Sequence, residues 1–335
     1  MARGFLAGYQ KRYPFLQSLA SRTRDFISDV LQGENVPYYS VTARAKSVDS
    51  VREKLLKKAY TRPARQVMDQ VGERVIVLRA SEVDGVAECL RSRLDVVEKD
   101  SADKRQALGL REFGYRSYHL VCRYGRGIDG GSGLVVGAPK VFEVQVRSLL
   151  DHVWAEIEHG VVYKAGANLP DLIKRRFASL AGALEMLERE FQALTDEAGG
   201  LVDSAKATIS FGALSKMPLD VPGLIALLET RVPNGLGFRG DGVGARPFPP
   251  GIEWRIVLAM RGAGIESVGS LDKILRSAQF RVWRRRYLAS LQGVDSEVSH
   301  LGVCLLVLGS RRMWLVSTYF PEFAQDIHLN AALAG

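Results

Sequence analysis

The sequence predicts an α/β protein. A mixed sheet of about five strands flanked by helices is expected over residues 1–200, and a smaller α+β domain over residues 203–335. Between residues 141 and 147 apolar and polar side chains alternate, which is typical of a strand with one buried face. Directly after this segment, apolar residues recur at helical spacing from Leu150 to Val161. Three more segments with strand-like composition precede this pair, at residues 37–46, 68–78 and 114–124.

The composition limits what the chain can be. With 335 residues it is long enough for two domains with sizeable cores. Its 47% hydrophobic and 25% charged residues are typical of a soluble globular protein. No apolar run is long enough to span a membrane, the N-terminus lacks a signal-peptide core, and the three cysteines lie far apart. We therefore expect a reduced, cytoplasmic protein without membrane contact. The net charge of +9 favours anionic partners such as nucleotides or RNA.

The chain begins with apolar residues at helical spacing over residues 1–34. Because Pro14 lacks a backbone donor, we expect it to break or kink this run, which gives a pair of docking helices.

A basic cluster lies where the strand over residues 37–46 gives way to a helix that begins near Ser47. These cations can converge on one anion, for which a triphosphate is the obvious candidate, and amides at the helix N-terminus would add donors. A basic helix face in water is the alternative. The cluster consists of Arg44, Lys46, Lys54 and Lys57, with Ser50 in the first turn of the helix.

The strand over residues 68–78 has Asp69 at its start and Gly72 three residues on. A carboxylate at this point could reach a metal, and a glycine lets a backbone approach closely.

A polar loop over residues 101–113 leads into the strand over residues 114–124, which begins with Tyr115 and His119. An aromatic ring beside a basic loop is suited to stack on a nucleobase. A tyrosine that caps the sheet edge and a structural histidine are the alternatives.

The polar face of residues 141–147 carries Glu143, Gln145 and Arg147. A carboxylate can hold a metal or accept a proton, an amide can read a polar edge, and a guanidinium can hold phosphate oxygens with two parallel hydrogen bonds. An amphipathic strand with its polar side chains in water would give the same alternation.

Taken together, these motifs resemble the RelA/SpoT-type alarmone synthetase domain. In chain order they are RAKSVDSVREK, DQVGERVIV, GYRSYHLV, FEVQVRSLLDHVWAEIEH and VYK. Each motif is short, but five in this order and spacing form a specific signal. The similarity covers about residues 35–200, including a helix over residues 171–197 that closes the domain. Only a short helical segment precedes Arg44, without the His/Asp pair of the family's hydrolase half. The chain therefore resembles a small, synthetase-only member.

The resemblance implies transfer of the β,γ-pyrophosphate of ATP to the ribose 3′-hydroxyl of GDP or GTP, with Mg²⁺ as cofactor, to give (p)ppGpp and AMP. Asp69 would ligate the Mg²⁺, and Glu143 would share it or accept the proton of the hydroxyl. Small members often form oligomers through their terminal helices, so the resemblance leaves two alternatives: a homo-oligomer, or a chain whose additional domain blocks or replaces that contact. By position, the ATP-binding residues would be Arg44, Lys46, Ser50, Lys54 and Lys57, and the acceptor-binding residues Arg111, Tyr115, His119, Gln145 and Arg147.

The segment before Tyr115 departs from the Lys-x-Asn-Gly pattern of the family, because it reads Arg111-Glu112-Phe113-Gly114. Arginine keeps the charge of lysine but not its geometry. Phe113 replaces an amide able to bond a guanine edge with a second stacking surface. Some branches of the family are toxins that make adenosine alarmones or pyrophosphorylate the 3′ end of tRNA, and they commonly sit beside, or are fused to, a neutralising domain. The acceptor is therefore open between guanine nucleotides, adenine nucleotides and tRNA.

The C-terminal part carries no recognisable catalytic motif. Gly199 and Gly200 are expected to end the closing helix, with residues 203–216 as a connection. The elements expected after it are helices over residues 220–232 and 271–291, a Gly/Pro-rich loop over 233–251, and strands over 254–260, 301–308 and 313–320. The second helix has arginines that would lie in water or contact RNA or a nucleotide, namely Arg281, Arg284, Arg285 and Arg286.

Three hypotheses remain open for the whole chain. It is a (p)ppGpp synthetase with a regulatory C-terminal domain, a toxic synthetase restrained in cis by residues 203–335, or a catalytically dead nucleotide sensor. The intact basic cluster, Asp69 and Glu143 favour an active enzyme. Phe113, the basic net charge and the additional domain favour the toxic synthetase.

Overall fold

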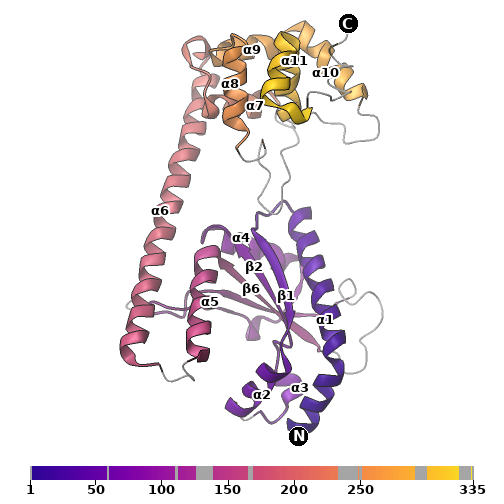
Figure 1. Ribbon diagram of the computed structural model, residues 1–335, viewed down its shortest axis with the longest axis vertical. Coiled ribbons are helices and arrows are strands. Elements are labelled where there is room, and N and C mark those ends of the chain that lie inside the picture. The colour runs from indigo at the N-terminus through magenta and orange to yellow at the C-terminus, as the bar shows by residue number, and fades with distance from the viewer. Residues whose placement is uncertain are drawn as a thin grey trace. The chain divides into compact units, whose positions relative to one another are not determined.

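The computed structural model describes residues 2–58, 60–109, 112–125, 139–164, 169–232, 248, 251–290, 300–323 and 333 (Figure 1). The chain divides into two units. The first comprises Met1–Gln192 with Asp241–Gly244, and the second comprises Ala193–Gly240 with Ala245–Gly335.

The first unit is built on a mixed six-stranded sheet with the strand order β1-β2-β6-β5-β3, in which β4 pairs with the free part of β5. The pair of β2 and β6 is parallel, and the other pairs are antiparallel. The prediction of a mixed sheet of about five strands is confirmed, with two-residue strands at one side. The strands are β1 (Ser40–Ala45), β2 (Val71–Val77), β3 (Asp95–Val96), β4 (Ala102–Asp103), β5 (Tyr118–Arg123) and β6 (Val141–Ser148).

One face of this sheet is covered by α1 (Ala2–Gly33) and α4 (Glu82–Arg93), which bury its apolar side chains. The alternation in β6 places Phe142, Val144 and Val146 in this core, each 0% exposed. Because side chains of a strand alternate between faces, the odd-numbered residues of β6 lie on the opposite face, where the polar row was predicted.

The first helix corrects one prediction. Residues 2–33 form one helix with Pro14 inside it, and not a helix pair. An internal proline costs a helix about 3 kcal/mol. Buried side chains spaced along the whole helix, from Tyr9 and Leu16 to Ile27 and Leu31, offset that cost.

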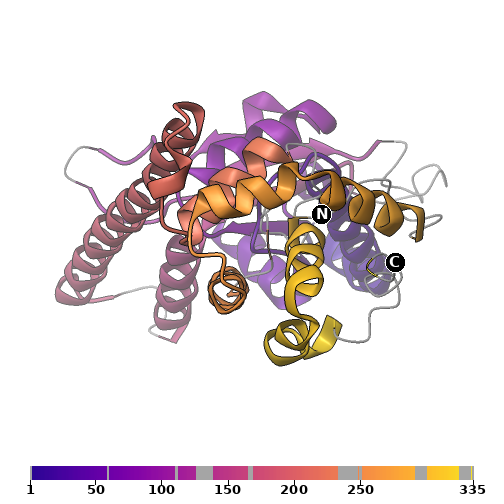
Figure 2. The same cartoon turned by 90° about the horizontal axis from the view of Figure 1, so that it is seen from above.

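Shorter helices flank the sheet. The predicted helix start near Ser47 is confirmed, since the Ser47 hydroxyl accepts a hydrogen bond from the amide of Ser50 at 3.2 Å. Helix α5 directly follows β6 and runs beside the first half of α6 (Figures 1 and 2). The remaining elements of the first unit are α2 (Val48–Lys57), α3 (Pro63–Gln66), η1 (Glu98–Asp100), α5 (Leu149–Lys164) and the beginning of α6 (Asp171–Ser210).

The predicted end of this helix at Gly199 and Gly200 is wrong, because α6 continues to Ser210. Each glycine weakens a helix by only about 1 kcal/mol. Ala205 and Ile209 are buried in the core of the second unit, so packing extends the helix through the expected connection.

The described part of the second unit is helical, so the predicted α+β domain is wrong there. Residues 254–260 lie in α8 and residues 301–308 and 313–319 in α11, where strands were expected. The predicted basic helix is two helices, α9 and α10, and most of the predicted Gly/Pro-rich loop lies outside the described residues. The elements are η2 (Leu214–Lys216), α7 (Val221–Arg231), α8 (Glu253–Gly262), α9 (Val268–Arg276), α10 (Ala278–Ser290), α11 (His300–Tyr319) and η3 (Pro321–Phe323).

One described helix is long and apolar enough to cross a membrane, contrary to the expectation from the sequence. This segment is Leu301–Tyr319 of α11, and half of it is buried within the structure. Residues 303–308 are each at most 4% exposed, and Arg311 and Arg312 interrupt the apolar run. A core helix has the same properties, so α11 is only weak support for membrane contact.

Candidate active site

The polar face of the sheet brings side chains from four strands together in two rows. In the first row, Arg44 of β1, Gly72 of β2 and Glu143 of β6 are direct neighbours across the strands. The second row has one more strand and contains Thr42, Arg74, Gln145 and His119. Both rows lie on the face opposite the apolar core, because strand residues alternate between the faces. The polar side chains of β6 therefore belong to a surface shared by several strands.

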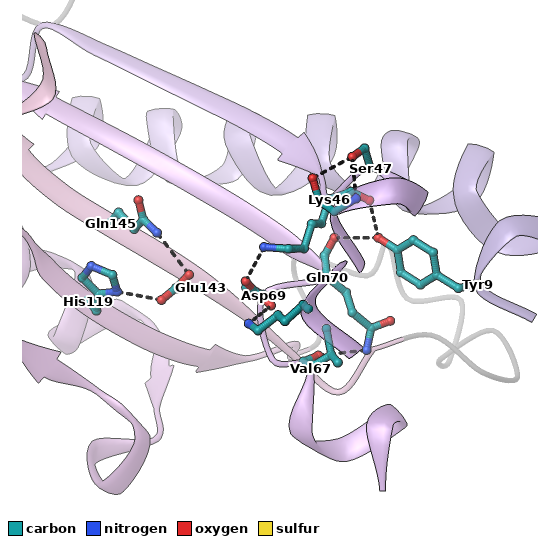
Figure 3. A network of polar contacts seen from close by, with 11 residues as sticks. Tyr9, Lys46, Ser47, Val67, Asp69, Gln70, His119, Glu143 and Gln145 are labelled. Atoms are coloured by element: carbon teal, nitrogen blue, oxygen red, sulfur yellow. Dashed lines mark hydrogen bonds and ion pairs between the residues drawn. The ribbon is translucent and has the colours of Figure 1, made fainter. Parts of the chain in front are cut away.

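Asp69 lies just before β2 and is held between two lysines (Figure 3). Its two carboxylate oxygens accept hydrogen bonds from Lys46 Nζ and Lys54 Nζ, each at 2.7 Å. Burial favours the neutral acid, but the two ammonium groups hold the pKa of Asp69 below its usual range. Asp69 is therefore ionised at neutral pH. The sequence placed these three residues in one site but did not indicate that they bond to one another.

Two contacts from distant segments fix the end of β1 at this point. The amide of Lys46 donates to the carbonyl of Gln70 at 2.9 Å, and the hydroxyl of Tyr9 donates to the carbonyl of Lys46 at 2.6 Å. Tyr9 is fully buried on α1. From the sequence it was only one residue of an apolar stripe, since nothing local reveals a partner 37 positions away.

A second network links five polar side chains of the site. Arg147 donates to the Tyr115 hydroxyl at 2.8 Å, and that hydroxyl lies 3.0 Å from Nε2 of His119. Nδ1 of His119 lies 2.7 Å from a carboxylate oxygen of Glu143. Gln145 also donates to Glu143, at 3.2 Å (Figure 3).

The donors in this network fix the direction of its hydrogen bonds. An arginine can only donate hydrogen bonds, so the Tyr115 hydroxyl accepts one from Arg147 and donates its own hydrogen bond to Nε2 of His119. Nδ1 of His119 then carries a hydrogen that it donates to Glu143. Burial favours the neutral form of Glu143, but the hydrogen bond from His119 keeps its pKa below the ordinary value. The network thus presents an ionised, oriented carboxylate.

A cavity of about 270 Å³ lies beside Asp69, and of the second network only Gln145 lines it. Gly72 lies in its wall, and a methyl group added there would have no atom within 4 Å. A ligand can therefore approach the backbone of β2 closely at this point. The cavity is lined by Thr42, Ala43, Arg44, Lys46, Asp69, Gly72, Glu73, Arg74 and Gln145.

The remaining predicted site residues are Ser50, Lys57 and Arg111. Ser50 and Lys57 lie exposed on α2 and do not line the cavity. Arg111 lies outside the described residues. Thr42 and Arg74 also line the cavity but were not among the predicted site residues. Each lies on the same strand face as a residue that was singled out, Thr42 with Arg44 on β1 and Arg74 with Gly72 on β2.

Asp69 and Glu143 are the carboxylates that could hold a metal here. They are close enough for the charge of Asp69 to act on the pKa of Glu143 in the upward direction. Among the described residues, no group of three or more His, Cys, Asp or Glu side chains could form a metal site by itself. Two carboxylates suit Mg²⁺, which commonly takes one or two protein ligands and completes its shell with water and substrate phosphates.

Comparison with known proteins matches the same part of the chain. Residues 43–168 match a family model described as a region found in RelA / SpoT proteins. The GTP pyrophosphokinase YjbM of Bacillus subtilis is 31% identical over 181 residues, which cover 53% of this chain and 80% of that protein. A second B. subtilis GTP pyrophosphokinase, YwaC, is 22% identical over 173 residues, which cover 50% of this chain and 79% of that protein. The crystal structure of small alarmone synthetase 1 from B. subtilis bound to its product pppGpp is 28% identical, with a TM-score of 0.47, and the match covers 59% of this chain and 97% of that one.

Proposed function

The chain belongs to the RelA/SpoT family of GTP pyrophosphokinases, and we propose that it transfers the β,γ-pyrophosphate of ATP to the ribose 3′-hydroxyl of GDP or GTP. The observation that carries this proposal is the row of Arg44, Gly72 and Glu143 across three strands, beside Asp69 between two lysines. Such a site combines cations for phosphates, an open backbone and an ionised carboxylate, as phosphoryl chemistry requires.

In the proposed reaction the 3′-oxygen of the acceptor attacks the β-phosphorus of ATP. The bond from that phosphorus to the oxygen bridging it to the α-phosphate breaks, and AMP leaves with this oxygen. The hydroxyl proton passes to Glu143, which His119 and Gln145 keep oriented and ionised. Lys46 and Arg44 hold phosphate oxygens at the cavity wall, and Tyr115 lies on the acceptor side of Glu143.

Magnesium is part of this proposal. Asp69 and Glu143 would hold the ion, and Mg²⁺ supplies neutralisation of the phosphate charge. Lys46 and Lys54 bond Asp69 in this structure. When Asp69 binds the ion, we expect these ammonium groups to turn towards the phosphates, where they retain an anionic partner.

The test uses purified full-length protein, Mg²⁺ and ATP labelled in its γ-phosphate, with GDP, GTP, adenine nucleotides and deacylated tRNA offered separately. Label in GDP or GTP supports the proposal. We expect Glu143→Gln to lower the rate about 100-fold or more, because it removes the base. Glu190→Gln, at an exposed position of α6, is the matched control and should leave the rate unchanged. An absence of label in every acceptor contradicts the proposal.

A second candidate is a toxic synthetase that acts on tRNA or adenine nucleotides and is restrained by its own C-terminal part. Phe113 favours it, because this ring is 47% exposed beside Tyr115 and replaces the family's amide. Label that moves only to tRNA or adenine nucleotides would support it. The restraint is tested by Leu227→Asp, which places a charge in the core of the second unit. Restraint predicts stronger growth inhibition on expression of this full-length variant, and unchanged growth would argue against it.

A further inference from the structure

Helix α6 holds the short segment that leads into β5, residues 112–117, on both sides of Tyr115. On one side, Phe113 lies against Gly182 of α6. A methyl group added at Gly182 would lie 3.2 Å from the Phe113 ring, so the absence of a side chain permits this contact. On the other side, Arg116 forms ion pairs with Glu188 at 3.2 Å and with Glu185 at 3.6 Å.

The three α6 residues in these contacts are spaced at i, i+3 and i+6, which places them on one side of the helix. The Glu188 side chain is only 7% exposed and also accepts a hydrogen bond from the buried hydroxyl of Ser148 at the end of β6. Water therefore screens the pair of Arg116 and Glu188 much less than a surface ion pair. Glu188 therefore joins α6 both to the end of β6 and to the segment that precedes β5.

The ring of Tyr115 packs against a small core that α5 and α6 share. This core is formed by Trp154, Ala155 and Ala181, and Phe177 of α6 also contributes to it. The indole nitrogen of Trp154 donates to the carbonyl of Phe177 at 3.2 Å, which locks α5 to α6 at this level. Tyr115 therefore has its ring against the core shared by α5 and α6, and its hydroxyl in the hydrogen-bond network of Glu143.

We propose that α6 is the positioning element of the acceptor site, in which Gly182, Glu185 and Glu188 set the place of Tyr115 through Phe113 and Arg116. The inference rests on the proposed function, which assigns Tyr115 to the acceptor side. The ATP side is held by other elements. Lys46 follows β1, Lys54 lies on α2, and Asp69 precedes β2. A shift of segment 112–117 should consequently act on the acceptor and not on ATP.

The decisive variant is Gly182→Ala, with Gly199→Ala as its matched control on the same helix. Both changes add one methyl group and favour helix by a similar amount, but a methyl group at Gly199 would have no atom within 4 Å. The assay is the labelled transfer, with GDP or with whichever acceptor the wild type uses. We expect Gly182→Ala to raise the acceptor KM between about 10-fold and 100-fold and the ATP KM less than about twofold. Gly199→Ala should change neither.

Introducing Gly182→Ala into a Phe113→Ala variant tests whether the effect of Gly182→Ala passes through the Phe113 ring or reflects a general change in the structure. The double variant should have the same acceptor KM as Phe113→Ala alone, because the methyl group added by Gly182→Ala then has no ring to displace. Additive effects, equal changes in both KM values, or a change in Gly199→Ala would overturn the proposal. Glu188→Gln, which keeps a hydrogen-bond acceptor for Arg116 and Ser148, should raise the acceptor KM less than Glu188→Ala.

A second readout does not depend on activity. Amide hydrogen exchange of residues 112–117 should be faster in Gly182→Ala than in the wild type and in Gly199→Ala, because the displaced ring loosens the segment. If the wild type transfers no label, the proposed function fails, and this measurement still decides whether α6 positions the segment. Equal exchange in all three proteins would refute the positioning role.

Discussion

Glu73 is a buried acid without a hydrogen-bond partner among the described residues, and replacing it by glutamine should change how stability depends on pH. It lies on β2 next to Gly72, but its side chain points into the apolar core and is 0% exposed. Within the part of the chain that the structure describes, neither carboxylate oxygen accepts a hydrogen bond. Burial raises its pKa from 4.5 to about 9, which Arg24 opposes and Asp25 reinforces.

The raised pKa sets the sign and size of the effect. At neutral pH the folded protein holds a proton on Glu73 that the unfolded chain has lost. The contribution of Glu73 to stability is therefore greatest below about pH 4.5 and falls as the pH rises towards 9. The slope is about 1.4 kcal/mol per pH unit, so the wild type should lose about 3 kcal/mol between pH ~6 and pH ~8 relative to Glu73→Gln. This is a large part of the stability of a domain, which is about 5–15 kcal/mol.

The assay must report the first unit alone, because two units can unfold separately. Urea-dependent amide hydrogen exchange of the β2 and β6 peptides meets that condition. Glu190→Gln, which removes an exposed charge, is the control and should follow the wild type. Parallel pH curves for the wild type and Glu73→Gln would refute the reasoning and indicate that Glu73 is ionised and paired with Arg24 in solution.

Three further predictions concern the site. Gly72→Val should leave the free energy of unfolding unchanged or raise it by up to about 1 kcal/mol, because valine favours a strand. The rate of label transfer should nevertheless fall about 100-fold, because the new side chain enters the cavity. Gly85→Ala, where the added methyl group also has no atom within 4 Å, is the control and should leave the transfer rate unchanged. Lys54→Met removes one hydrogen-bond partner of Asp69 and should raise the pKa of Asp69. The ATP KM in initial-rate assays should rise about 10-fold. Tyr115→Phe breaks the link from Arg147 to His119, so kcat should fall about 10-fold and the acid limb of the pH–rate profile should move to higher pH.

The site surface could be predicted from sequence because a period of two residues reports which strand positions share a face. Glu143, Gln145 and Arg147 needed only that local rule. The ion pair of Arg116 and Glu188 joins residues 72 positions apart, and no local pattern indicates it. Glu73 shows the limit of the rule, since its position in the alternation of β2 is a core position, although its side chain is polar.

The second unit was mispredicted for a related reason. Residues 303–308 are six consecutive buried residues, so the segment has no polar side from which a helical period could be recognised. A short apolar run buried on all sides fits a strand as well as a helix. The end of α6 was mispredicted for a different reason. Gly199 and Gly200 are typical of a helix end, and only the burial of Ala205 and Ile209 explains why the helix continues.

Two glutamates on neighbouring strands show what makes the site chemically competent. Glu73 and Glu143 lie one position apart in the register of β2 and β6, on opposite faces of the sheet. Burial pushes the pKa of both upward, and Glu143 is itself only 19% exposed. Glu143 nevertheless has a pKa below its ordinary value because His119 and Gln145 donate hydrogen bonds to it. Glu73 has no donor among the described residues, and its pKa is about 9. The hydrogen-bond donors, and not exposure to water, therefore keep Glu143 ionised at neutral pH. Because Tyr115 and Arg147 hold His119 in place, the residues assigned to the acceptor also control the ionisation of the base that would act on it.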